Sequence, residues 1–297
     1  MQTIKDCKQL YMILFLVMLL PVVAKIAVVG DWGCPECTSA RMVAQSLRAT
    51  NPDYVISVGD HFYPEGIQST SDANVFSWID MWIPSVPWYL ILGNHDYYGN
   101  SQAQVDLTNT FTYWNMESRY YTEILDDIQI WFLDTTPLLD LDIFDFHDAT
   151  SGTIIDTLYT QRIDAEMQYE WLQTSLQNSI TSRKIFVGHH PLWTFGNVDN
   201  IGKTTFKPKI LAFMQEYGVE SYVSGHDHSL QDIQYGNLRQ FIAGSGAFSY
   251  EFDKTPLLQE ARLNFRSDEF GFLLVDGYNY TFYTTENRML YTTNIYK

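Results

Sequence analysis

The sequence is short of positive charge and, beyond its first 24 residues, of long apolar runs. It has 18 Lys and Arg against 35 Asp and Glu, which gives a formal net charge of -17. A surface this acidic repels the phosphate backbone of nucleic acids, so we do not expect a nucleic-acid partner. Carboxylates are the usual ligands of hard cations, but acidity alone identifies no metal site.

Cysteine is also scarce, with three in the chain. Cys34 and Cys37 form a single Cys-Pro-Glu-Cys pair, whereas a structural zinc site takes about four ligands. The pair predicts a local disulfide in an oxidising compartment, with two free thiols as the alternative. One Asn-x-Ser/Thr sequon begins at Asn279 in a strand-like segment, so glycosylation there is left open.

The first 24 residues differ from the rest. Lys5 and Lys8 precede an uncharged apolar run from Leu10 to Ala24 that ends in small residues, as a secretory signal peptide does. The alternative is an uncleaved membrane anchor, but the run is shorter than the roughly 18 apolar residues that span a bilayer. We predict a signal peptide over 1–24, one domain over 25–297, no stable membrane span after cleavage, and a secreted or lysosomal/vacuolar location.

No repeat, low-complexity tract or linker rich in Pro, Gly or Ser divides the chain after residue 24. Short β-branched or aromatic runs alternate with helical stretches, which predicts α/β layers. The predicted strands are 25–30, 54–59, 88–93, 184–188 and 221–225, and the predicted helices are 39–50, 72–82, 166–177 and 206–217. The helix over 166–177 carries an apolar stripe expected in the core, namely Met167, Trp171, Leu172 and Leu176.

After Gly236 the pattern changes to strands almost alone, at 239–243, 271–275, 279–284 and 289–294. We expect these strands to add a second sheet. The predicted fold class is therefore α/β, with two mixed β-sheets packed as a sandwich and flanked by helices. Residues 137–164 show no clear period and carry repeated aspartates, so they are predicted to be a solvated surface loop, with a functional lid as the alternative.

Five predicted strands end in a glycine followed by polar or ionisable residues. These ends are Gly30-Asp31, Gly59-Asp60, Gly93-Asn94-His95-Asp96, Gly188-His189 and Gly225-His226-Asp227-His228. Ligands of open α/β sheets collect at the carboxyl ends of strands, so the five ends can converge in one crevice. A lone Gly-Asp usually marks a turn and a lone histidine is usually structural, but five such ends together predict a common site.

The potential ligands exceed the coordination shell of one ion. They are Asp31, Asp60, Tyr63, Asn94, His189, His226 and His228. Two ions that share one carboxylate would account for this number. Tyr63 follows Asp60 by three residues, and a cation as highly charged as Fe(III) can bind a tyrosine as phenolate. Tyr63 therefore points to iron, with an aromatic packing residue as the alternative.

Taken in order, these motifs resemble those of the purple acid phosphatases, a branch of the calcineurin-like metallophosphoesterases with a four-layer architecture. The similar motifs are Gly-Asp-x-Gly at 30–33, Gly-Asp-x-x-Tyr at 59–63, Gly-Asn-His-Asp at 93–96, His189 ahead of Pro191, and Gly-His-x-His at 225–228. The short chain resembles the tartrate-resistant, mammalian-type subgroup, and the similarity covers nearly all of residues 25–297.

The resemblance implies two metal sites and several residues that act on the substrate. Fe(III) would bind Asp31, Asp60, Tyr63 and His228, while Fe(II), Zn(II) or Mn(II) would bind Asp60, Asn94, His189 and His226, with Asp60 bridging. His95 would hydrogen-bond phosphate and assist the leaving group, and Asp96 would orient it from behind. Asn94 would also contact the substrate.

The chain departs from the family in two places. The stretch Trp193–Asp199 lacks the second active-site histidine that follows His-x-Pro in relatives, and His190 stands where relatives carry other residues. His190 is predicted to contact substrate as a proton donor, with a loop histidine of no role as the alternative. The missing histidine leaves substrate handling and the pH optimum open. Residues 137–164 take the place of the family's protease-sensitive loop without clear similarity to it.

The predicted function is hydrolysis of small phosphomonoesters or phosphoproteins by a monomeric acid phosphatase, through attack of a metal-bound hydroxide at an Fe(III)–M(II) centre. The chain has this metal set and no separate Ser or Cys nucleophile motif. One alternative is a phosphodiesterase or nucleotide hydrolase of the same superfamily that uses Mn(II) or Zn(II). The other is an iron-carrying or redox protein on the same fold. His95 favours catalysis, because a carrier needs the ligands but not the acid.

Overall fold

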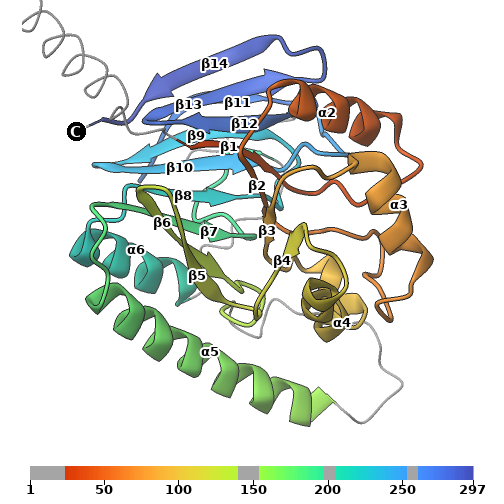
Figure 1. Ribbon diagram of the computed structural model, residues 1–297. Coiled ribbons are helices and arrows are strands. Elements are labelled where there is room, and N and C mark those ends of the chain that lie inside the picture. Colours follow the sequence, from red (N-terminus) through yellow and green to blue (C-terminus); the bar gives the residue numbers. More distant parts are fainter. Residues whose placement is uncertain (1–23, 140–153, 197–204, 253–259, 297) are drawn as a thin grey trace, which may run out of the picture.

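The computed structural model describes residues 24–139, 154–196, 205–252 and 260–296, and over 154–163 it describes the backbone alone. The predicted signal peptide up to residue 23 and Asn197–Asp199 lie outside the described residues. Two seven-stranded sheets pack face to face, with helices outside them (Figure 1). The predicted fold class, two mixed sheets flanked by helices, is confirmed.

The first sheet has the order β14-β13-β12-β1-β2-β3-β4. β1 to β4 run parallel, and β12, β13 and β14 join the other edge antiparallel. The strands are β1 (Lys25–Val29), β2 (Tyr54–Ser57), β3 (Trp88–Leu90), β4 (Trp114–Asn115), β12 (Gly271–Asp276), β13 (Asn279–Thr284) and β14 (Met289–Asn294).

The second sheet has the order β11-β9-β10-β8-β7-β6-β5. β6, β7, β8 and β10 are parallel, with antiparallel strands at both edges. The strands are β5 (Tyr121–Leu125), β6 (Ile128–Leu133), β7 (Arg183–Gly188), β8 (Ser221–Ser224), β9 (Leu230–Tyr235), β10 (Leu238–Ala243) and β11 (Arg262–Ser267).

The late strands do not form a sheet of their own, so that expectation was wrong. β12 pairs with β1, with Leu274 opposite Ala27, while β10 pairs with β8. Both partners are buried strands that each need a neighbour for their backbone hydrogen bonds. The sheets then meet through apolar side chains, among them Phe241 of β10 stacked on Tyr280 of β13 with 4.3 Å between ring centroids.

Helices cover both outer faces of the sandwich (Figure 1). The first sheet is flanked by α2 (Thr38–Ala49), α3 (Ala73–Trp82), α4 (Ser101–Asp106) and the short turns η1 (His95–Tyr98) and η2 (Leu107–Asn109), and the second by α5 (Ile154–Gln177) and α6 (Phe206–Tyr217). Asp72 caps α3 by accepting a hydrogen bond from the Asn74 amide. In the described part of the chain, no helix is long and apolar enough to cross a membrane.

Helix α5 corrects two expectations. It begins at Ile154, so the C-terminal part of the predicted 137–164 loop is helical, whereas residues 140–153 lie outside the described residues. Met167, predicted to lie in the core, is 54% exposed. Gln168 takes the inward position instead, because its side-chain amide accepts from the Asp134 amide and donates to the Asp134 carbonyl. Leu172 and Leu176 are buried as predicted.

Buried tryptophans support the loops that follow β1 and β2. Trp32 packs edge-on against Trp82 and Trp88, at 5.3 Å and 5.9 Å between ring centroids, and its indole donates to Ser57. The side chain after Asp31 is thus wedged into the layer between the first sheet and α3. Cys34 and Cys37 follow and form the predicted disulfide, with their Cα atoms 5.3 Å apart.

Candidate metal centre

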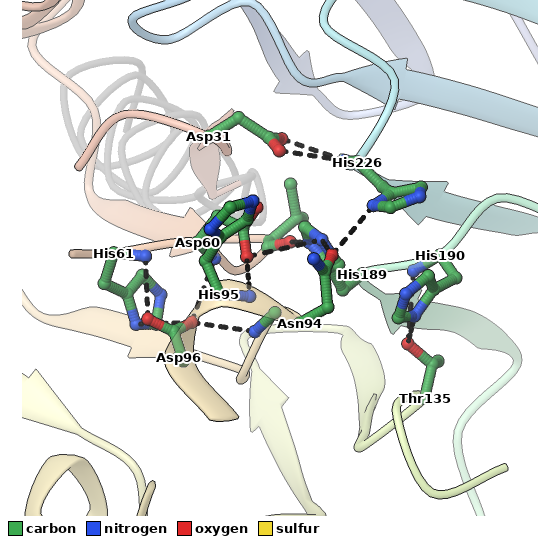
Figure 2. Close-up of polar contacts among 12 residues, drawn as sticks. Asp31, Asp60, His61, Asn94, His95, Asp96, Thr135, His189, His190 and His226 are labelled. Atoms are coloured by element: carbon green, nitrogen blue, oxygen red, sulfur yellow. Dashed lines mark hydrogen bonds and ion pairs between the residues drawn. The ribbon is translucent and has the colours of Figure 1, made fainter. Parts of the chain in front are cut away.

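The five predicted strand ends converge at one edge of the sandwich. Asp31, Asp60 and Asn94 follow β1, β2 and β3 of the first sheet, while His189 and His226 follow β7 and β8 of the second. Figure 2 shows these side chains pointing toward one another. Parallel strands place their carboxyl ends at the same edge, and packing the two sheets brings both sets of ends into one site.

A first group of potential ligands surrounds the hydroxyl of Tyr63. Its Oη lies 2.7 Å from Asp60 Oδ2 and 3.2 Å from both Asp31 Oδ1 and His228 Nε2. The His228 nitrogen is itself 3.4 Å from Asp31 Oδ1. These four side chains therefore direct three oxygens and one nitrogen at a common point.

A second group surrounds the side-chain oxygen of Asn94. Asn94 Oδ1 lies 3.0 Å from His189 Nε2 and 2.9 Å from His226 Nδ1. His189 Nε2 is also 3.5 Å from Asp60 Oδ1. Asp60 thus presents one carboxylate oxygen to each group, which is the geometry of a bridging ligand.

Backbone conformation aims the ligands that follow the strands. Asp31, Asp60 and His226 have φ angles of 57°, 57° and 66°, in the left-handed region. This region is strained for residues with a side chain, by about 1–3 kcal/mol each. Gly93 passes so close to Asp60 that a Cβ on it would lie 2.1 Å from Asp60 Oδ1. The site therefore depends on a close approach of backbone to carboxylate.

The buried carboxylates of the site need positive charge nearby. Asp31 and Asp60 are 0% and 1% exposed, and in the described ranges neither carboxylate pairs with a lysine or arginine. Burial raises the pKa of Asp60, and the charge of Asp31 adds to the effect. Burial opposes ionisation of Asp31 as well, but its bond with His228 and the nearby histidines lower its pKa. Because buried charges need partners, two cations fit this set of ligands.

The remaining ligands also suit metal ions. Burial, followed by the charges of Asp31 and Asp60, raises the pKa of the Tyr63 phenol well above its usual value, so a strong positive charge would be needed to bind it as phenolate. Burial and the proximity of His189 lower the pKa of His226 to about 3, which keeps that imidazole neutral. His189 Nδ1 donates to the Val58 carbonyl at 2.8 Å, so its Nε2 faces Asn94 as a lone pair.

His95 lies at the rim of the site and Asp96 beneath it. The family resemblance implied that the Asp96 carboxylate would lie behind the His95 ring and orient it, but in the structure another group contacts the ring. His95 Nδ1 lies 2.7 Å from the Pro64 carbonyl, which orients the ring. The buried carboxylate of Asp96 instead accepts the backbone amides of Asp60, His61 and Gly93, at 3.0, 3.0 and 2.8 Å. Three amides converge on it because adjacent loops leave them without strand partners.

Two buried residues near the site were missed in the sequence. His61 contacts the Gln104 side chain at 2.9 Å, and Gln104 donates to Asp96 at 2.9 Å. His61 also packs against Trp32, with 5.3 Å between ring centroids. The position of His61 next to Asp60 was the one available signal, whereas nothing local marks Gln104. Both hold the loop under the site.

Comparison with known proteins identifies the family. Residues 24–230 match the family model described as calcineurin-like phosphoesterase. Tartrate-resistant acid phosphatase type 5 of Mus musculus is 30% identical over 247 residues, which cover 74% of this chain and 71% of the mouse protein. Purple acid phosphatase 3 of Arabidopsis thaliana is 28% identical over 272 residues, which cover 84% of this chain and 70% of the plant protein.

Two solved structures share the fold. GAP50, the anchor in the inner membrane complex of Plasmodium, has a TM-score of 0.71 at 19% identity, covering 91% of this chain and 88% of its own. Purple acid phosphatase PPD1 from yellow lupin has a TM-score of 0.61 at 16% identity, covering 91% of this chain and 53% of its own. At these identities the likeness shows the fold alone.

The fold and the two groups of ligands define a metal-dependent phosphoesterase. The chain belongs to the calcineurin-like phosphoesterase family, within which its relatives are the tartrate-resistant and purple acid phosphatases. It is accordingly an enzyme that hydrolyses phosphate esters with a dinuclear metal centre.

Proposed function

We propose that the chain is an acid phosphatase that hydrolyses phosphate monoesters at an Fe(III)–M(II) centre. The observation that carries this proposal is the position of the Tyr63 hydroxyl, 2.7 Å from Asp60 Oδ2. A tyrosine beside a bridging carboxylate suits a trivalent ion. The same feature argues against a phosphodiesterase or nucleotide hydrolase with Mn(II) or Zn(II) at both positions.

The two groups of ligands divide between two ions. The proposed Fe(III) ligands are Asp31, Asp60, Tyr63 and His228, and the proposed ligands of Fe(II), Zn(II) or Mn(II) are Asp60, Asn94, His189 and His226. The distances that support this division are those around Tyr63 Oη and around Asn94 Oδ1. Asp60, which presents an oxygen to each group, would hold the two sites together.

Two ions held there would lower the pKa of a coordinated water, to about 7 for Zn(II), and draw charge from the phosphate. Side chains of the protein would do the rest. Asn94 directs Oδ1 at two histidines, so its NH₂ group remains to donate to a phosphate oxygen. His95 is held through Nδ1 by Pro64, so its other nitrogen, Nε2, is free to give a proton to the departing oxygen.

The proposal also covers the processing, location and oligomeric state of the protein. The signal peptide over 1–24, the single domain over 25–297, secretion or lysosomal/vacuolar delivery and the monomeric state stay predictions. The disulfide between Cys34 and Cys37 supports an oxidising compartment. Small phosphomonoesters and phosphoproteins are the proposed substrates, and the net charge of -17 argues against nucleic acid.

A purified full-length chain should be coloured, bind two metal ions and hydrolyse an aryl phosphate monoester. Chelation should abolish turnover, and adding back iron together with a divalent ion should restore it. Tyr63→Phe should remove the visible band, because the band requires a phenolate on Fe(III). Metal analysis, visible spectroscopy and a monoester assay check these outcomes, with the exposed Tyr98→Phe as the matched control that keeps its colour.

Different outcomes would favour the alternatives. A colourless, iron-free chain that hydrolyses a phosphate diester faster than the monoester would support the phosphodiesterase. A coloured chain with two ions but no turnover of any phosphate ester would support an iron-carrying or redox protein.

His95→Ala should lower kcat by about 10²- to 10⁴-fold, because the variant loses the proposed proton donor. The loss should depend on the leaving group. An alkyl phosphate, whose alkoxide needs a proton, should suffer far more than p-nitrophenyl phosphate. Metal content should not change, since His95 lies outside both groups of ligands. Equal losses for the two substrates would show that His95 does not protonate the leaving group.

A further inference from the structure

His190 forms, with His189 and His226, a cluster of three imidazoles at the second group of ligands. The ring centroid of His190 lies 4.9 Å from that of His189 and 4.6 Å from that of His226, and the latter two are 5.1 Å apart. Their planes are inclined at 83°, 52° and 74°. The rings therefore do not stack, but surround a common point from three sides.

The position of His190 is fixed by polar contacts on the side away from His189 and His226. Its Nδ1 lies 2.8 Å from Thr135 Oγ1, and its amide donates to the same oxygen at 3.1 Å. Its carbonyl accepts the hydroxyl of Tyr222 at 2.7 Å. Figure 2 shows Thr135 below the ring. With Nδ1 engaged by Thr135, Nε2 is the ring nitrogen left to bind an ion. The Thr135 hydroxyl can donate to Nδ1 or accept from it, and Nε2 serves as a ligand when Thr135 accepts, as the Val58 carbonyl does for His189.

Burial argues against contact between His190 and the substrate. His190 is 3% exposed, whereas His95 is only partly buried at the rim. One potential ligand atom from each of His189, His190 and His226 lies within 4.8 Å of the other two. Three nitrogens spread evenly around one ion at about 2.1 Å are roughly 3.6 Å apart. Separations of up to 4.8 Å would therefore have to shorten, by as much as about 1.2 Å, for all three to share one shell.

We propose that His190 is a third imidazole ligand of the second metal ion, rather than a substrate contact. The inference rests on the proposed function and adds one ligand to Asp60, Asn94, His189 and His226. A site with three imidazoles favours Zn(II) or Fe(II) over Mn(II), because Mn(II) prefers oxygen ligands. With a fifth protein ligand, the second ion would also have one coordination position fewer for water or substrate.

Titration of the metal-depleted full-length chain tests this role. After Fe(III) has filled the first site, Zn(II) and Mn(II) are titrated separately into wild type, His190→Gln and His190→Phe. We expect both variants to bind Zn(II) at least about 10-fold more weakly, with a smaller change for Mn(II). The Tyr63–Fe(III) band should stay unchanged. Asp80→Asn, which changes an exposed side chain on α3, is the control and should bind Zn(II) as wild type does.

X-ray absorption at the zinc edge of Fe(III)–Zn(II) wild type gives an independent answer that needs no variant. Three imidazoles bound to zinc would support the proposal, and two would overturn it. Folded His190 variants with unchanged Zn(II) affinity would also overturn the proposal. If such variants were in addition less strongly inhibited by phosphate, His190 would be a substrate contact instead. Wild type that does not bind two ions would instead refute the proposed function itself.

Discussion

Asp60→Asn is expected to reduce phosphatase activity by roughly 10³-fold or more and to lower the metal content from two ions to one or none. The substitution keeps the shape of the side chain but removes its charge. Asp60 Oδ2 lies 2.7 Å from Tyr63 Oη and Asp60 Oδ1 lies 3.5 Å from His189 Nε2, so one side chain serves both groups. A neutral amide would weaken both proposed sites together.

Thermal unfolding of the metal-free chain separates this loss from misfolding. Asp60 is buried with Asp31 and Asp96, whose charges raise its pKa together with burial. Removing one of several buried carboxylates relieves repulsion, so the metal-free variant should be at least as stable as wild type at neutral pH. Asp80→Asn, the same chemical change on the exposed side of α3, is the control. Full metal content and activity in Asp60→Asn would show that Asp60 does not bridge.

Gly93→Ala is expected to be almost as damaging, although it alters no ligand. The added Cβ would lie 2.1 Å from Asp60 Oδ1 and 2.5 Å from the Asp60 amide nitrogen. These contacts are too short to persist, so the Asp60 carboxylate must move and the amide must lose its bond to Asp96. We expect activity to fall by at least about 10²-fold and the metal content to drop, as measured by steady-state kinetics and metal analysis.

Gly236→Ala is the matched control for this prediction. Gly236 lies in the turn between β9 and β10, has a φ of 58°, and leaves open space around an added Cβ. The variant should lose about 1–2 kcal/mol of stability through backbone strain while keeping its activity and both metals. If Gly93→Ala behaved like this control, the backbone at Gly93 would not position Asp60.

Much of the site could be predicted because its chemistry is local in the sequence. Each potential ligand follows a strand within a few residues, and glycine marks the point where the backbone must turn sharply. Asp31, Asp60 and His226 show why, since each takes a left-handed φ directly after a glycine. Strand, glycine and ligand together are a short-range signal, so the set of predicted ligands came together in space.

The predictions that were wrong concern features set by contacts between residues far apart in the sequence. The pattern of β12 reads as a strand in any sheet, and only pairing with β1, at the other end of the chain, places it in the first sheet. The helical period of α5 alone does not decide whether Met167 or Gln168 faces the core. The backbone of Asp134, more than thirty residues away, selects Gln168 by offering it two hydrogen bonds.

The sequence by itself determined the fold class, the potential metal ligands and the shortage of positive charge in the chain, because these follow from residue type and from spacing along the chain. Only the tertiary structure decided that the ends of two different sheets share one site and that Asp60 presents an oxygen to each group. It also assigned Asp96 to the backbone amides and His190 to the imidazole cluster. These assignments depend on distances between segments far apart in the chain, which are set when the two sheets pack together.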